Sequence, residues 1–473
     1  MAKWQSGARM KRFLCSTSAL IAVGLVANEA SAASGLKLGI TGFYRNSIGG
    51  TFGGNSPTTQ FAGTGPLAQG VGVTTAGLGN FDRQNVSMRQ EIRVNFTGET
   101  TLDNGITVGV LVGLNGESVL KSGSTTQVDR AYADFSGKFG QIRVGETDSA
   151  LSQDCILDPG NVTSNFGVNS PYESFSNVGF AQQRNQTTGV ANVSNAGGGT
   201  LRNGNPPLGG YFSTFGVAPI GSIGTCYGID LKGNKIVYFS PNFGGLTFGA
   251  SYQPQAYSRF AGGGLAYGTD VTAPVAGGGA NVLSVAADYQ HDFGGVKLTA
   301  GGGGEWAFTQ YTPAGATTSD KPAWYNLGLQ LGFGAWAVGA SAAYYTNYAH
   351  AGYGATNAAS GDDGWVVTAG GSYTIDAWSF GLQGMYANYQ QSGAVITGIP
   401  FATASDQEYW AVSLNGAYAL GPGIALEGQV AYTDTNYGSV SALGVSVPVP
   451  VAVGVSASQV SSWEIDFGTA INF

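Results

Sequence analysis

The sequence predicts an all-β fold, an antiparallel transmembrane β-barrel of sixteen strands. Three observations lead to this prediction. Apolar and polar residues alternate with period two in many segments, which is typical of strands with one apolar and one polar face. The 473 residues include 78 glycines and 12% aromatic residues but only 10% charged residues, against about 25% in soluble domains. After residue 32 no apolar run reaches the length of a membrane-spanning helix, so a closed barrel is the spanning structure left.

The first 32 residues have the features of a secretory signal peptide. Four basic residues precede a short apolar run at 13–27, and Ala30, Ser31 and Ala32 form a small-residue cleavage motif. We expect cleavage after Ala32, which leaves residues 33–473 as a single barrel domain. A retained membrane anchor is the alternative, but the apolar run is short and contains Ser16, Thr17 and Ser18.

The charge balance argues against a nucleic-acid partner. Removing the leader removes four basic residues and one acidic residue, so the net charge changes from −8 to −11. Phosphate backbones require a basic face. An exported chain with few charges and no spanning helix can still cross a membrane as a closed β-barrel, which makes membrane lipid an expected partner.

The alternation is clearest in residues 87–100, which predict a strand. Its apolar face carries Met88, Ile92, Val94 and Phe96. Its polar face carries Arg89, Glu91, Arg93, Asn95, Thr97 and Glu99. The sequence Asp103-Asn104-Gly105 follows, and it predicts a tight hairpin turn because glycine tolerates a positive φ. The chain then returns through a second alternating segment, 106–117.

Seven short turns of this kind separate predicted strand pairs, and longer Gly-, Ser-, Thr- and Asn-rich segments separate the pairs from each other. The turns are 103–105, 137–140, 241–245, 291–295, 332–334, 374–377 and 421–423. The predicted strands are 36–48, 87–101, 106–117, 127–136, 141–147, 233–240, 246–258, 281–292, 296–310, 323–332, 335–349, 364–374, 377–391, 408–420, 423–437 and 459–473. Alternating short and long connections are typical of outer-membrane barrels.

Aromatic residues and the C-terminus support the same fold. Trp336 and Trp378 are next to short turns, whereas Trp324, Trp365, Trp410 and Trp463 are next to long segments. Both barrel rims are therefore predicted to carry rings at the lipid headgroups, although aromatics are also common in ordinary strands. The last segment, 461–473, alternates up to its final residue, Phe473. We expect it to pair with the first strand and close the barrel, with Phe473 facing lipid at the rim of the short turns. A terminal strand of a soluble sandwich is the alternative.

Three sequence stretches resemble the general porins of Gram-negative outer membranes. They are "RVNFTGETTLDNGITVGVLV" (93–112), "VDRAYADFSGKFGQIRVGETDSA" (128–150) and "NKIVYFSPNFGGLTFGASY" (234–252). The terminal Phe473 also resembles the family's signal for the outer-membrane insertion machinery. The resemblance implies a water-filled, homotrimeric, sixteen-stranded barrel whose long third loop, here about 148–232, folds inward. It implies passive diffusion of small hydrophilic solutes and ions. One departure is Val237 and Phe239 on the strand after this loop, where the family often has charge.

Charged residues on the predicted inner face are the candidates for a pore constriction. Strand parity places Arg89 and Arg93 inward, and Arg130, Arg143 and Arg45 fit the same face. The resemblance implies a basic wall at Arg93 and Arg130. Fixed cations in a narrow pore require counter-charge, and Asp154 and Asp158 at the start of the long loop are candidates. The alternative is that these arginines pair with Glu91, Glu99 and Asp134 and only stiffen the wall.

The mature chain has two cysteines, Cys155 and Cys226, one near each end of the long loop. Export to an oxidising compartment favours a disulfide; two buried thiols or a metal pair are alternatives. The histidines, His291 and His350, lie far from both cysteines in the sequence, and neither accompanies a nucleophile motif. We therefore expect no enzyme, metal or cofactor. The function alternatives are a substrate-selective channel on the same barrel and a structural or adhesive surface barrel.

Overall fold

The computed structural model describes residues 35–52, 86–115, 128–168, 224–226, 233–254, 279–310, 321, 323–346, 363–389, 395–396, 399–404, 406–436, 439–442, 454–456 and 459–473. The predicted signal peptide and its cleavage site lie outside these residues. So do residues 169–223 and 227–232 of the long third loop.

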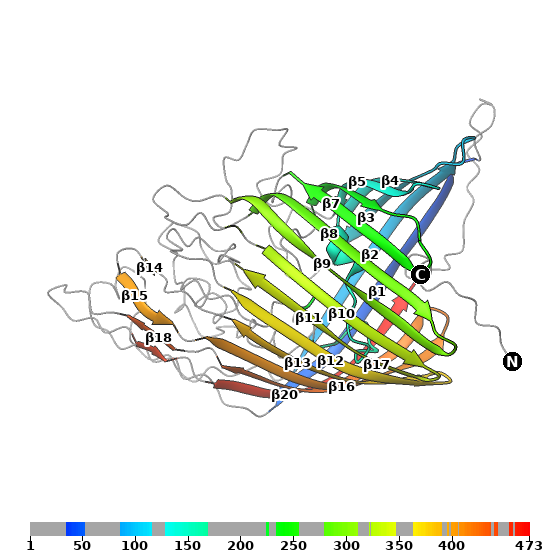
Figure 1. Ribbon diagram of the computed structural model, residues 1–473. Coiled ribbons are helices and arrows are strands. Elements are labelled where there is room, and N and C mark those ends of the chain that lie inside the picture. Colours follow the sequence, from blue (N-terminus) through cyan, green and yellow to red (C-terminus); the bar gives the residue numbers. More distant parts are fainter. Residues whose placement is uncertain are drawn as a thin grey trace.

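Sixteen antiparallel strands close into a barrel (Figure 1), as the sequence predicts. In order round the barrel they are β1 (Lys37–Phe52), β2 (Val86–Thr101), β3 (Thr107–Asn115), β4 (Val128–Gly137), β5 (Gly140–Thr147), β6 (Gly233–Phe239), β7 (Leu246–Gln253), β8 (Gly279–Asp292), β9 (Val296–Gln310), β10 (Ala323–Phe333), β11 (Trp336–Thr346), β12 (Gly364–Ile375), β13 (Trp378–Tyr389), β16 (Gln407–Gly421), β17 (Ile424–Asn436) and β20 (Gln459–Asn472).

All seven predicted short turns join neighbouring strands, from β2–β3 to β16–β17. They gather at one end of the barrel, on the right side of Figure 1. Positive φ angles at Gly105 (80°) and Gly334 (59°) explain why these turns contain glycine. Asp376, with φ of 50°, takes the same role in the turn between β12 and β13.

The outer face of the barrel is apolar, as alternation predicts. Leu327, Leu414 and Phe467 are more than half exposed there, which suits contact with lipid chains. Exposed tryptophans mark both rims. Trp336 and Trp378 pack against tyrosines near the short turns, and Trp365 and Trp410 do so near the opposite rim.

Trp324 does not belong to the outer aromatic ring, so that expectation is wrong. Its side chain is 1% exposed and stacks on Tyr345, with ring centroids 5.1 Å apart. Both rings lie on the inner face, where they join a buried apolar cluster with Leu151 and Val168 of the third loop. A tryptophan at the rim can face lipid or the barrel interior, because side chains one residue apart along a strand point to opposite faces.

The C-terminal strand closes the barrel against β1. Gly42 N donates to Phe473 O (2.7 Å), and Phe473 N donates to Gly42 O (3.0 Å). The Phe473 ring lies over Gly42, where a Cβ would come within 2.9 Å of Cζ. The ring is 43% exposed on the apolar face of β20. Glycine at position 42 thus provides the space for the last side chain of the chain.

Five further elements were not predicted. Four short strands form a separate sheet beyond the barrel end opposite the short turns (Figure 1): β14 (Val395–Ile396), β15 (Ile399–Ala404), β18 (Ser439–Ala442) and β19 (Gly454–Ser456). The fifth is α3 (Ala150–Asp154), one helical turn at the start of the third loop. Within the part of the chain described, no helix is both long and apolar enough to cross a membrane.

Candidate functional site: a barrel interior lined on one side

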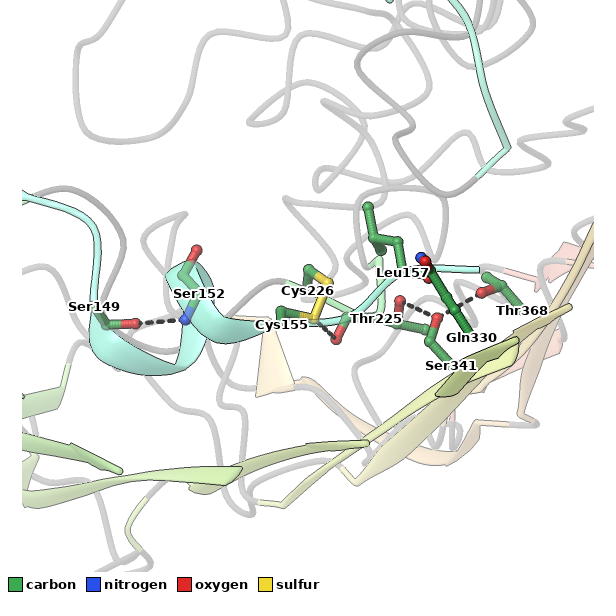
Figure 2. Close-up of a disulfide and its surroundings, with 9 residues drawn as sticks. All are labelled: Ser149, Ser152, Cys155, Leu157, Thr225, Cys226, Gln330, Ser341 and Thr368. Atoms are coloured by element: carbon green, nitrogen blue, oxygen red, sulfur yellow. Dashed lines mark hydrogen bonds between the residues drawn. A yellow bond between two sulfur atoms is a disulfide. The ribbon is translucent and has the colours of Figure 1, made fainter. Parts of the chain in front are cut away.

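The third loop leaves β5 at Thr147 and turns immediately onto the inner wall. Residues 148–168 of this loop are called the liner below. Ser149 caps α3, because its Oγ accepts from Ser152 N (3.1 Å; Figure 2). The first helical amides donate to wall side chains, Ala150 N to Ser251 Oγ (3.1 Å) and Leu151 N to Ser284 Oγ (3.0 Å). Serines of β7 and β8 thus satisfy amides that a helix start leaves without partners.

Beyond α3 the liner follows the wall from strand to strand. Asp158 accepts from Gln383 Nε2 of β13 (2.9 Å) and from Gly160 N (3.0 Å). Asn415 of β16 donates to Gly160 O and accepts from Val162 N, both at 2.9 Å. These contacts join residues more than 220 positions apart in the sequence. They hold an extended segment flat against the inner face of the barrel.

Glu427 of β17 fixes the far end of the liner. Its carboxylate accepts from Ser164 N (2.8 Å), Asn165 N (2.9 Å) and Asn165 Nδ2 (2.7 Å). The side chain is 6% exposed, and a buried carboxylate is tolerated when amides satisfy its oxygens. The liner therefore runs from β7 round to β17 and reaches β20, where Phe166 lies beside Gly468.

A disulfide joins the liner to the returning limb of the third loop. Cys155 and Cys226 are bonded, with Cα atoms 5.6 Å apart. Figure 2 shows the bond above strands β10–β12. Thr225, next to Cys226, shares a hydrogen bond with Ser341 (2.7 Å), which shares another with Thr368 (2.6 Å). Both limbs of the long loop are thereby attached to the same part of the wall.

The opposite wall, β1 to β4, carries partly exposed arginines. Arg45 and Arg93 both face Glu91, with N–O distances of 3.4 and 3.9 Å. Both guanidiniums also lie over the Phe43 ring, at 4.3 and 5.1 Å from its centroid. Arg93 Nε donates to Asn115 Oδ1 (3.2 Å). The side chains of Arg45 and Arg93 keep 23% and 18% of their surface exposed.

Arg130 extends this basic row to β4. It forms an ion pair with Asp148, the first residue of the liner, at 2.7 Å. These two side chains are 33% and 22% exposed. Arg130 and Asn95 flank Gly113 of β3, where a Cβ would lie 3.8 Å from Arg130 Cβ and 2.8 Å from Asn95 Oδ1. Gly113 has no side chain and therefore leaves space between Asn95 and Arg130, beside the row of arginines.

The predicted constriction residues separate into distinct groups. Arg93 and Arg130 lie in the basic row with Arg45. Arg143 is 2% exposed and donates to Gln153 Oε1 (2.6 Å) and Thr147 Oγ1 (3.3 Å). It therefore holds α3 against β5. The Arg89 side chain lies outside the described residues.

The predicted counter-acids are placed differently from the expectation that they face the arginines across the water path. Asp158 is 4% exposed, and its carboxylate accepts hydrogen bonds from Gln383 Nε2 and Gly160 N. Asp154 ends α3 over β7, where a Cβ on Gly249 would come within 2.8 Å of Asp154 Oδ2. The carboxylates that do meet the arginines are Glu91 and Asp148. Sequence distance could not reveal this, because the liner carries Asp154 and Asp158 away from β4.

Two further charged residues of the inner face were not among the predicted site residues. Glu427 has the inward parity of its strand, which was the available signal. Lys235 shares the inward face of β6 with Val237, so this strand carries one charge beside the apolar Val237 and Phe239. Lys235 is 3% exposed and is buried in the interior.

The metal and catalytic alternatives concern the acidic residues, the cysteines and the two histidines. No group of three or more His, Cys, Asp or Glu residues there is placed to hold a metal ion. His291 is an exposed residue near the end of β8, between the rings of Tyr289 and Phe293, at centroid distances of 5.9 and 4.4 Å. His350 lies outside the described residues.

Comparison with known proteins agrees with the barrel. A family model described as Gram-negative porin matches residues 17–438. The chain belongs to the Gram-negative porin family. This porin is therefore an outer-membrane channel for small solutes. No curated protein sequence matches it.

Several solved structures are similar to this porin. The anion-selective porin from Comamonas acidovorans is 15% identical, with 93% of this chain and 100% of that chain covered and a TM-score of 0.49. The outer-membrane channel DcaP of Acinetobacter baumannii is 11% identical, with 94% and 99% covered and a TM-score of 0.49. OmpT of Vibrio cholerae in its trimer form is 12% identical, with 93% and 100% covered and a TM-score of 0.48.

Proposed function

We propose that solutes diffuse passively along the β1–β4 wall and that its arginines give the channel a preference for anions. The observation that carries this proposal is the unequal exposure of charges in the barrel. Arg45, Arg93 and Arg130 keep 18–33% of their side-chain surface exposed. On the lined wall, Asp158 and Glu427 are 4% and 6% exposed. The Asp158 carboxylate accepts a hydrogen bond from the side chain of Gln383 on the wall, and the Glu427 carboxylate accepts from the backbone amide of Asn165 in the liner.

The local charge of this row supports anion preference despite the negative net charge of the chain. Three guanidiniums meet two carboxylates, Glu91 and Asp148. Charges on the outer loops are screened over about 8–10 Å in physiological salt. Charges beside a narrow water path act on an ion at closer range and are screened less. The row therefore has more influence on permeating ions than the overall charge.

Three further proposals concern biogenesis. The signal peptide, residues 1–32, is cleaved after Ala32, which N-terminal sequencing of the outer-membrane form would test. The insertion machinery reads the terminal strand that ends in Phe473. The mature chain assembles as a homotrimer within outer-membrane lipid, as OmpT of Vibrio cholerae is described in its trimer form.

The experiment is a reversal-potential measurement on purified protein in planar bilayers under a salt gradient. Wild-type channels should show an anion preference. Arg93→Ser and Arg130→Ser should each shift the reversal potential toward cations. Lys138→Ser is the matched control, because Lys138 is exposed in the turn after β4 and should leave the potential unchanged.

Each outcome separates the proposal from its rivals. Reversal potentials that stay unchanged in both arginine variants, with conductance intact, would refute the basic row as the filter. Absence of any conductance would favour a structural or adhesive barrel. A solute current that saturates with concentration would favour a substrate-selective channel.

A further inference from the structure

We propose that glycines on the inner wall set how far the liner stands from the barrel and thereby set the largest solute that passes. This inference rests on the proposed diffusion path and adds the positions that control its width. The liner has two faces, one against the wall and one toward the remaining interior. Any group added between liner and wall moves the liner toward that interior.

Close approach of the liner backbone to the wall at three glycines carries the argument. A Cβ on Gly328 of β10 would lie 2.0 Å from Ile156 O, and a Cβ on Gly381 of β13 would lie 2.2 Å from Gly160 O. On Gly370 of β12, a Cβ would lie 2.7 Å from Gly160 Cα. Real Cβ atoms essentially never approach other atoms closer than 3.0 Å. The liner backbone therefore lies closer to these strands than any residue larger than glycine would allow.

The same close seating continues along the liner. A Cβ on Gly303 of β9 would lie 2.8 Å from Leu151 Cδ1, and one on Gly339 of β11 would lie 2.8 Å from Pro159 Cδ. At the far end, a Cβ on Gly468 would lie 3.2 Å from Phe166 Cζ. At these three positions a carbonyl oxygen of the neighbouring strand is closer still, at 2.1–2.7 Å, so the liner is a second reason for glycine there. Gly328 and Gly381, by contrast, have a liner carbonyl oxygen as the nearest atom.

The liner, rather than the wall, is the part able to move. Gly328 is paired on both sides, with Gly301 of β9 and Ser341 of β11, within a closed sheet. The liner near it is an extended segment without strand partners, held by side-chain hydrogen bonds from Gln330 and Gln383. Restoring a 3.0 Å contact at Gly328 requires a displacement of about 1 Å, because packed interiors leave little free space. That displacement narrows the path between liner and basic row.

The test compares single-channel conductance and the size limit for neutral sugars in liposome swelling. Gly328→Ala and Gly381→Ala should lose conductance and exclude the largest sugars that wild type admits. Gly332→Ala is the matched control, because it lies on the same strand and face as Gly328 and a Cβ there meets nothing closer than 3.7 Å. It should behave as wild type. Assembly is checked by the yield of heat-resistant protein.

A milder variant keeps the test decisive if these alanines impair assembly. A Cβ on Gly301 meets Ile156 Cγ1 of the liner and Asp288 Cβ of the wall at 3.0 Å, and Ala287 O at 3.1 Å, so Gly301→Ala should assemble with a smaller loss of conductance. Adding Ile156→Ala removes the one liner atom among these contacts and should restore the conductance. Unchanged or raised conductance in the assembled glycine variants, or no restoration in the double variant, would overturn the inference. A wild type without conductance would instead refute the proposed diffusion path.

Discussion

The wall formed by β1 to β4 and the wall from β7 to β20 use the same strand alternation for opposite purposes. On β1, β2 and β4, the inward face carries arginines, and Arg45, Arg93 and Arg130 stay partly exposed. From β7 to β20, many inward positions carry glycine or short polar residues, and the liner covers them. Within the described residues, the liner lies along the wall whose inward positions are small, where its backbone can come close to the strands.

The difference also explains where the acids are found. On the lined wall, buried carboxylates such as Glu427 and Asp158 accept hydrogen bonds and hold chain segments in place. Along the β1–β4 wall, the guanidiniums meet Glu91 and the liner residue Asp148, which remain 34% and 22% exposed. Acidic residues are thus structural on one side and part of the local field on the other.

The largest expected effect concerns the joint where the two walls meet, between β20 and β1. Phe473→Ala should lower the yield of assembled, heat-resistant protein several-fold, because the ring over Gly42 covers the closing pair of strands. Phe467→Ala is the control, since Phe467 lies on the same outer face of β20 and is 63% exposed. Equal yields for the two variants would contradict a special role for the terminal residue.

The next effect would break the attachment of the liner to its wall. Glu427→Ala leaves the amides of Ser164 and Asn165 without their acceptor, at a cost of about 1–3 kcal/mol for each buried donor. Hydrogen exchange of residues 160–168 should accelerate at least tenfold while the barrel strands stay protected. Glu99→Ala, which changes an exposed glutamate of β2, should leave that exchange unchanged. Protection retained in Glu427→Ala would show that this carboxylate does not hold the liner.

The disulfide should have a smaller effect on the barrel itself. Its cysteines are 71 residues apart, so the chain-entropy model gives about 4 kcal/mol for the loop it closes. The liner and Thr225 keep their hydrogen bonds to the wall without it. Cys155→Ser/Cys226→Ser should therefore assemble but show larger fluctuations of the open-channel current. Two free thiols in native protein, detected by alkylation and mass spectrometry, would contradict the bond.

The smallest effects sharpen the contrast between exposed and buried acids. Asp148→Asn removes a charge from the basic row and should shift the reversal potential toward anions. A unit charge a few ångström away in water contributes on the order of 0.5–1 kcal/mol, so the permeability ratio should change by about twofold or more. Asp158→Asn, on the side of the liner that is buried against the wall, should leave the potential unchanged. A larger shift for Asp158→Asn than for Asp148→Asn would reverse our assignment of the two walls.

The sequence alone determined the barrel. The period-two alternation, the seven turns and the terminal strand are local patterns, and they correctly predicted sixteen strands and their neighbours. Local parity also gave the inward face of Arg93 and Arg130. These features depend on residues a few positions apart, for which side-chain direction follows directly from strand geometry.

Only the tertiary structure decided what each inward residue does. The parity of Arg143 and the position of Asp158 gave no sign that both would be buried by docking of the liner. The contact between Gly328 and Ile156 joins residues 172 positions apart, and Asn165 meets Glu427 across 262. The path of a loop across a wall depends on shape and hydrogen bonding summed over many strands, and no local pattern encodes that sum.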